Sequence, residues 1–373
     1  MTTLRHNDIW RRDFDISTSQ YNDISIRKWR PANIAVAFLL AAMLTGCGGS
    51  DIIDDDNNVE APKPLATSNE EIRVNTNVTS MMTRANTIDN NTALQGYDLK
   101  IDAYYNGTDD KYLDGTKLHY TGGDPAWQFW SGSPGSQAHY YWPFEGSKTA
   151  GGATASTLDF VGFCPFEKPA YIGTPTYNHS TGVSFTCDMS SYMTLARQTG
   201  GEAPTIPTMQ EFLVAVLNEQ TLATQTAAVG GALPLQFKHP LAIIKFTITA
   251  ASGTNVQINS ISIADLYTSA TCTYDGTDLD WGSHSGSAAM TVSQTLKNGG
   301  TTESTGYMII PNNYDSKTLT VNATWDSWSN PVTQNVTADV NFNWQPGYIY
   351  TYNLTLEKYA LKVETTESYT EQW

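Results

Sequence analysis

Cys47 is the residue whose type and position most clearly allow a chemical modification. It follows Thr45-Gly46, and before these lie an apolar run, residues 34–44, and a basic cluster, residues 27–30. This order is typical of a secretory signal, in which small residues precede the cleavage site. The apolar run is too short to span a bilayer. Cleavage before Cys47 would make this cysteine the first residue of the processed chain.

Leu44-Thr45-Gly46-Cys47 resembles the lipobox of bacterial lipoproteins, in which signal peptidase II cuts before the cysteine and the new N-terminus is acylated. We therefore expect residues 1–46 to form a signal peptide and Cys47 to be the lipidation site. The alternative is an ordinary secretory signal, which would leave Cys47 as a free extracellular thiol.

Residues 47–68 contain an acidic segment and a Pro-rich segment and have too little apolar content to fold, so we expect a tether. An acidic run directly after a lipidated cysteine resembles the signal that exports lipoproteins of some Gram-negative bacteria to the outer face of the outer membrane. The expected location is therefore the cell outer membrane, facing outward. The alternative is a solvated linker without an export role.

The sequence shows no arrangement of catalytic residues. Asp278 and Asp280 could serve as paired glycosidase acids, but they lie close to turn residues. No serine has the sequence context of a nucleophile elbow. The histidines beyond the signal are scattered without the spacing of metal ligands: His119, His139, His179, His239 and His284. We expect a protein without enzymatic activity, metal or cofactor.

The composition limits the partners. The chain has a formal net charge of −16, and an acidic surface disfavours nucleic acid and anionic lipid. Beyond Cys47 there are Cys164, Cys187 and Cys272, which cannot all pair in an oxidising compartment. Cys164 and Cys187 lie in strand-like runs. A disulfide between them is one alternative, and buried free thiols are the other.

Most of the chain beyond the tether alternates apolar and polar residues with period two, which is typical of half-buried β-strands. Residues 71–78 show this pattern, and turn signals such as Asn106-Gly107 and Asp275-Gly276 separate the later runs. The runs are residues 97–105, 158–163, 242–248, 256–263, 319–325 and 348–356. The pattern predicts an all-β fold of antiparallel sandwiches.

One short helix is expected within this β fold. Thr208 to Glu211 has the form of a capping box, and the apolar residues at 212, 213, 216 and 217 would share one helical face. We expect this helix to end near Thr221. The small-residue segment 227–234 then predicts a boundary between an N-terminal domain, residues 69–228, and a C-terminal domain, residues 229–373.

Aromatic residues are concentrated in one stretch: Trp127, Phe129, Trp130, Tyr140, Tyr141, Trp142 and Phe144. They could stack on sugar rings at a surface or form part of a core. Trp127, Phe129 and Tyr141 alternate as strand positions do, which favours the core.

Several short motifs occur in a fixed order along residues 47–356, and together they resemble the fimbrillin family, the subunits of type V pili. They are the lipobox with its acidic tail, Thr83-Arg84-Ala85, Tyr141-Trp142-Pro143, residues 160–165, His239-Pro240-Leu241-Ala242, Pro311 and residues 344–352. The resemblance implies two transthyretin-like antiparallel β-sandwich domains. It also implies assembly with other pilus subunits by donor-strand exchange.

In that scheme a trypsin-like arginine protease cuts after the first strand, which leaves and is replaced by a strand from a neighbouring subunit. Arg84 is the candidate cleavage point, and Arg73 ranks below it because it lies within the strand. The alternative is that Arg84 is a solvated residue that is not cut. The removable strand would present four side chains on one face: Ile72, Val74, Thr76 and Val78.

The C-terminal segment, in which Leu361 and Val363 alternate with polar residues, could supply the donor strand. It could equally be an ordinary sheet edge of the second domain.

The expected function is thus a structural or adhesive subunit of a cell-surface fimbria, anchored in the outer membrane by its lipid until processing and able to bind a host or bacterial surface ligand. The alternative is a surface glycan-binding lipoprotein with four tryptophans as stacking platforms: Trp127, Trp130, Trp325 and Trp328.

Overall fold

The structure is a computed structural model. It describes residues 67–78, 90–105, 107–131, 135–143, 157–195, 209–250, 256–297, 301–303, 306–325, 330–357 and 360–368. All of these residues belong to one compact unit, Glu60–Trp373.

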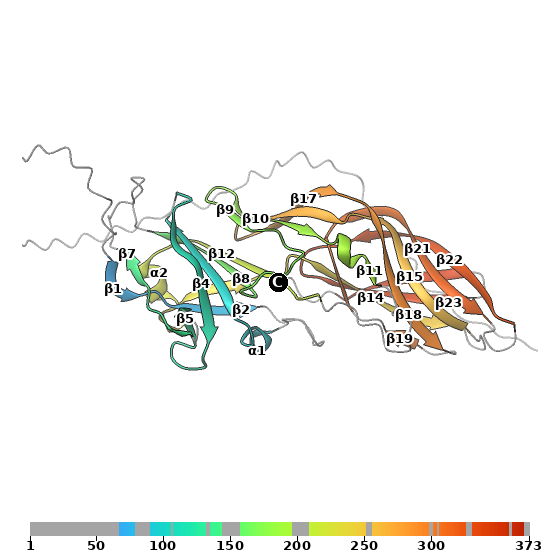
Figure 1. Cartoon of the computed structure of the whole chain (residues 1–373), viewed down its shortest axis with the longest axis horizontal. Helices are drawn as coiled ribbons and strands as arrows, with labels where there is room; N and C mark the ends of the chain where they lie inside the picture. Colours follow the sequence, from blue (N-terminus) through green and yellow to red (C-terminus); the bar gives the residue numbers. More distant parts are fainter. Residues whose placement is uncertain are drawn as a thin grey trace, which may run out of the picture. The chain divides into compact units, whose positions relative to one another are not determined.

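The described residues are mostly in β-strands, which confirms the predicted all-β fold class (Figure 1). Within this part of the chain there are two short α-helices in place of the one expected, α1 (Asn91–Leu94) and α2 (Leu222–Ala227). The transthyretin-like topology and the domain limits 69–228 and 229–373 stay predictions.

The N-terminal part is built around a six-stranded antiparallel sheet with the strand order β12-β8-β3-β4-β5-β6. Two further pairs accompany it, β1 antiparallel to β7 and β2 parallel to β13. The strands are β1 (Thr67–Glu71), β2 (Val74–Val78), β3 (Leu99–Tyr105), β4 (Lys111–Tyr120), β5 (Trp127–Ser131), β6 (Ser136–Gln137), β7 (Tyr141–Pro143), β8 (Leu158–Cys164), β12 (Leu213–Gln220) and β13 (Leu233–Phe237).

The remaining strands form three sheets, ordered β17-β16-β10-β9, β11-β18-β15-β21-β22 and β19-β14-β23-β24, and β20 also pairs with β14. Their bounds are β9 (Thr176–Asn178), β10 (Gly182–Asp188), β11 (Thr194–Leu195), β14 (Ala242–Ala250), β15 (Val256–Leu266), β16 (Ser269–Tyr274), β17 (Leu279–Ser285), β18 (Ala288–Lys297), β19 (Thr301–Glu303), β20 (Tyr307–Ile309), β21 (Asn313–Trp325), β22 (Val332–Asn343), β23 (Ile349–Glu357) and β24 (Ala360–Ser368). Two 3-10 turns complete the description, η1 (Ser190–Tyr192) and η2 (Val229–Gly231).

Buried apolar side chains form two main clusters. The N-terminal core lies between the six-stranded sheet and the pair β2–β13, and β13 contributes Leu235 and Phe237 to it. Gly162 on β8 makes this contact close, because a Cβ there would lie 2.7 Å from Leu235 Cδ2 and 2.9 Å from Phe237 Cζ. The larger core takes most of its residues from the later sheets. Strand β13, although it follows residue 228, therefore packs with the first strands of the chain.

The predicted helix over residues 212–221 is wrong, because this segment is strand β12. Val214 and Val216 point into the larger core, while Leu213 and Ala215 point into the N-terminal core. A strand that is buried on both faces is a continuous apolar run, and periodicity alone cannot distinguish it from one face of a helix. Antiparallel pairing of Leu213–Gln220 with β8 stabilises this segment as a strand.

Helix α2 starts immediately after β12, where the helix was expected to end. Thr221 is its N-cap: its hydroxyl accepts from the Thr224 amide at 3.0 Å, and its own amide donates to the Thr224 hydroxyl at 2.8 Å. This reciprocal pair satisfies two amide groups that the first turn leaves open. The residue expected to cap the helix, Thr208, lies outside the described residues.

Candidate functional site: the binding site of the first strand

The first strand segment, which we define as residues 67–78, has one buried and one exposed face along its second half. Ile72, Val74, Thr76 and Val78 are buried, and the residues between them are exposed. Three of the four side chains belong to the N-terminal core as apolar residues, and Thr76 is the exception. The four side chains that the period-two pattern assigns to one face are thus the ones that are buried in the structure.

Strand β2 lies at the edge of the fold. It pairs with β13 in parallel, with Val74 opposite Leu233, Thr76 opposite Leu235 and Val78 opposite Phe237, and among the described strands it has no second partner. Parallel pairing is slightly less stable per residue than antiparallel pairing. Strand β2 is therefore deeply buried through its side chains but bound along only one backbone edge.

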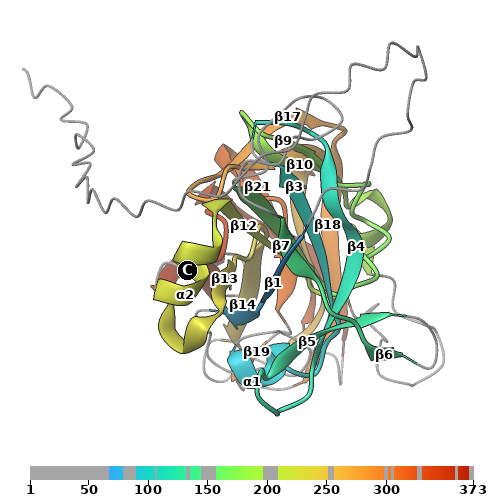
Figure 2. The same ribbon diagram turned by 90° about the vertical axis from the view of Figure 1, so that its left-hand side faces the viewer.

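A glutamine side chain from α2 holds the start of β2. Gln225, only 5% exposed, donates from Nε2 to the carbonyl of Glu71 at 2.9 Å and accepts at Oε1 from the amide of Arg73 at 2.9 Å. These two backbone groups flank Ile72, whose own amide donates to the Tyr140 carbonyl at 2.7 Å. The carboxamide therefore replaces a neighbouring strand at the point where the segment passes from β7 to β13. Figure 2 shows α2 beside β13, and β1 beside β7.

The indole of Trp142 fixes the orientation of this carboxamide. Its Nε1 donates to Oε1 of Gln225 at 3.0 Å, so this oxygen must be the acceptor and the amide nitrogen must face Glu71. Buried polar groups with all partners present strengthen a unique geometry. Both hydrogen bonds from Gln225 to the first strand segment involve main-chain groups, so they do not depend on the side chains of that segment.

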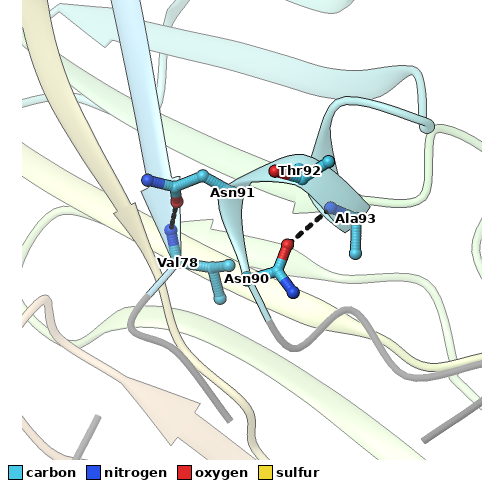
Figure 3. A pocket seen from close by; sticks show the side chains of 5 residues that line it. All are labelled: Val78, Asn90, Asn91, Thr92 and Ala93. Atoms are coloured by element: carbon cyan, nitrogen blue, oxygen red, sulfur yellow. Dashed lines mark hydrogen bonds between the residues drawn. The ribbon is translucent and has the colours of Figure 1, made fainter. Parts of the chain in front are cut away.

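A second carboxamide holds the other end of β2. The Asn91 Oδ1 accepts from the Val78 amide at 2.8 Å, while Asn90 caps α1 by accepting from the Ala93 amide at 2.9 Å (Figure 3). These residues and Thr92 line an open hollow of about 590 Å³ where β2 ends. Both ends of the buried strand are thus held by side-chain amides that bind its backbone.

The predicted processing and lipidation residues are only partly described. Cys47 and Arg84 lie outside the described residues. Arg73 has an exposed side chain, but its amide is bound to Gln225 and its carbonyl accepts from the Leu233 amide at 2.8 Å. A backbone paired on this side is a poor protease site. The ranking of Arg84 above Arg73 stays a prediction.

Cys164, Cys187 and Cys272 are all free and buried, so the structure has no disulfide between Cys164 and Cys187. Cys164 belongs to the N-terminal core and the other two to the larger core. Burial raises the pKa of the Cys187 and Cys272 thiols well above the usual range, and a neutral thiol is a poor nucleophile.

The tryptophans named for sugar stacking are mostly covered. Trp127 and Trp325 are buried in the two cores, and Trp130 is partly buried with its ring centroid 4.8 Å from that of His119. Trp328 lies outside the described residues. Tyr141, expected in the core, has an exposed side chain, whereas its neighbour Trp142 is buried. Burial leaves Trp127 and Trp325 no free ring face for a glycan.

Strand β24 at the C-terminus forms an antiparallel hairpin with β23 and bonds to no other strand of the described part. Leu361 and Val363 are partly buried and pack against the larger core. In the described residues no group of three metal-ligating side chains comes together. That part of the chain also contains no helix long and apolar enough to cross a membrane.

Comparison with known proteins gives one family. Residues 83–373 match the family model described as fimbrillin-like. No curated protein sequence matches the chain.

Among solved structures, a candidate cell adhesion protein of Bacteroides ovatus is 14% identical with a TM-score of 0.47, over 81% of this chain and 97% of that one. Another, of Bacteroides uniformis, is 17% identical with a TM-score of 0.44, over 79% and 97%. The tip fimbrial protein Mfa3 of Porphyromonas gingivalis, with a C-terminal truncation, is 12% identical with a TM-score of 0.32, over 72% and 92%. At these values the structural likeness adds nothing to the family match.

Proposed function

Because this chain belongs to the fimbrillin-like family, we propose that it is a structural or adhesive subunit of a cell-surface fimbria. It is exported as a lipoprotein through Cys47, cut at Arg84 by an arginine-specific protease, and assembled when a strand of a second subunit replaces the first strand. The observation that carries this proposal is the binding of β2, whose alternate side chains fill a core while its backbone is bound along one edge and at both ends by side-chain amides.

The binding site of the first strand suits exchange for physical reasons. Departure of β2 would expose the apolar side chains of the N-terminal core and leave the backbone groups of β13 without a partner. An incoming strand restores the hydrogen bonds and buries its own alternate side chains, as in other cases of strand addition. No catalytic group is needed for this step.

The chain itself contains a strand of matching pattern. Ile72-Arg73-Val74-Asn75-Thr76 and Leu361-Lys362-Val363-Glu364-Thr365 share the order apolar, basic, valine, polar, threonine. The second sequence lies in β24, which is a sheet edge near the C-terminus. The partner strand that we propose is therefore β24 of a second copy or the equivalent strand of a related subunit.

The test is the intact mass and N-terminal sequence of the protein in sheared surface material from its native cells. We expect an N-terminus at Ala85 and polymer ladders that resist detergent. Arg84→Ala should leave the chain unprocessed and monomeric, and Arg73→Ala, the matched control, should be processed normally. A chain that still begins at acylated Cys47, stays with the cells and forms no ladder would contradict the proposal.

A further inference from the structure

Thr76 is the one polar side chain on the buried face of β2. It is 7% exposed, and its Oγ1 is buried without a hydrogen-bond partner among the described residues. The backbone amide of Thr76 does have a partner, the Asn75 Oδ1 at 2.9 Å. The side-chain hydroxyl is therefore a buried polar group without a hydrogen bond, while the backbone amide of the same residue is bound.

The surroundings of this hydroxyl are apolar. Thr76 stands opposite Leu235 in the β2–β13 register, and the side chains of Val74 and Val78, next on the same face, lie in the N-terminal core. Burying a hydroxyl without a hydrogen bond costs free energy, whereas an aliphatic group of the same shape gains from burial. Valine has the shape of threonine with a methyl group in place of the hydroxyl, so it would fit without new space.

We infer that the position of Thr76 is a pocket for an aliphatic side chain, which the first strand of the chain fills imperfectly, and that a partner strand with valine or isoleucine there replaces it. This inference rests on the proposed function for the identity of the partner. It gives a reason why exchange would favour the entering strand, because the strand that leaves buries an unpaired hydroxyl at this position and the entering strand buries an aliphatic group.

Position 76 is the inward position at which a change of side chain can most improve the binding of one strand over another. The contacts from Gln225 and Asn91 bind main-chain groups, which every strand except one with proline there supplies equally. The other inward positions, Ile72, Val74 and Val78, are already aliphatic and buried. Selection between strands by side-chain chemistry is therefore concentrated at Thr76.

The pocket also bears on strand β24 of a second copy as the partner. If Leu361 took the place of Ile72, Thr365 would take that of Thr76, and nothing would be gained. A displacement by two residues keeps the same face inward and puts Val363 in the pocket, but it moves Thr365 to the buried position of Val78. The inference therefore favours the equivalent strand of a related subunit with an aliphatic residue at this position.

The first experiment measures hydrogen exchange of the peptide 67–78 in the intact full chain. Thr76→Val should slow exchange of the β2 amides about tenfold, which corresponds to about 1.4 kcal/mol. Asn77→Val is the matched control, because Asn77 is exposed on the same strand, and it should change the rate less than about threefold. Equal or faster exchange in Thr76→Val would overturn the inference.

The second experiment uses a full chain with a specific protease site placed within residues 80–88. After cleavage, labelled peptides of sequence 69–80 with threonine or valine at position 76 compete for the binding site. We expect the valine peptide to bind about tenfold more tightly. Equal binding would refute the inference while strand exchange stands. If neither peptide binds and Thr76→Val still slows hydrogen exchange, strand exchange is refuted and the aliphatic preference of the pocket stands.

Discussion

The first strand segment, residues 67–78, and the last described strand have similar sequences and different environments. In the first strand segment, Ile72-x-Val74 is buried in the N-terminal core, although β2 pairs only with β13. In β24, Leu361-x-Val363 is partly buried, although the strand pairs with β23 along its whole length. The first strand segment is thus stabilised mainly by burial of its side chains, and β24 mainly by its backbone pairing. A strand whose apolar side chains are only partly buried keeps apolar area to offer to a partner.

The largest effect that tests this difference comes from a buried charge. Val74→Asp should lower the free energy of unfolding by about 4 kcal/mol, because an unpaired carboxylate would enter the N-terminal core. The same change in β24, Val363→Asp, should cost about 1 kcal/mol, because this side chain keeps contact with solvent. Urea unfolding of both variants measures the difference. Equal losses would contradict the comparison.

The next largest effect tests the hydrogen bonds of the Gln225 carboxamide to the first strand segment. Gln225→Leu keeps the volume but leaves the Glu71 carbonyl, the Arg73 amide and the Trp142 indole without partners, at a cost of about 3 kcal/mol. Hydrogen exchange should speed up in residues 67–78 and stay unchanged in β24.

The matched control for Gln225→Leu is Thr226→Val, a substitution at the next residue of α2. Its side chain is exposed and bonds only within the helix, to the Leu222 carbonyl at 2.9 Å. This variant should leave exchange in residues 67–78 at the wild-type rate. If it loosened the first strand as much as Gln225→Leu, the effect would belong to the helix and not to the carboxamide.

The smallest effect is expected at the other end of β2. Asn91→Leu removes the acceptor of the Val78 amide, but this amide borders an open hollow where water can replace the lost oxygen. We expect a loss of about 1 kcal/mol or less, with faster exchange confined to the last residues of β2. Thr92→Val, on the same exposed turn, is the control. Loss of protection along the whole first strand would show that Asn91 does more than bind its end.

The sequence allowed β2 to be predicted because only one of its faces is buried. Alternation from Ile72 to Val78 is then visible without any knowledge of the partners. The same reasoning failed at β12, since Val214 and Ala215 face opposite cores and both are apolar. Apolar-polar alternation identifies a strand that is buried on one face. A strand that is buried on both faces is a continuous apolar run, which cannot be distinguished from a buried helix segment.

The residues that bind the first strand could not be predicted in the same way. Gln225 lies in the short helix α2, and nothing in the sequence of that helix marks it as a contact of the first strand segment. Its partner, the Arg73 amide, is 152 residues away along the chain and is a backbone group, which has no signature in sequence. Thr76, by contrast, interrupts an aliphatic pattern that is visible in the sequence, but only the structure shows that its hydroxyl has no partner.

The two carboxamides at the ends of β2 also have a mechanical consequence. In a fimbria whose subunits are joined by a strand in this position, that strand carries the tension along the fibre. Pulling along its axis loads all of its bonds to β13 at once, whereas peeling would break them one after another. A force that peels from either end meets Gln225 or Asn91 first. In such a fimbria the joint would be protected at both ends against the mode of rupture that needs the least force.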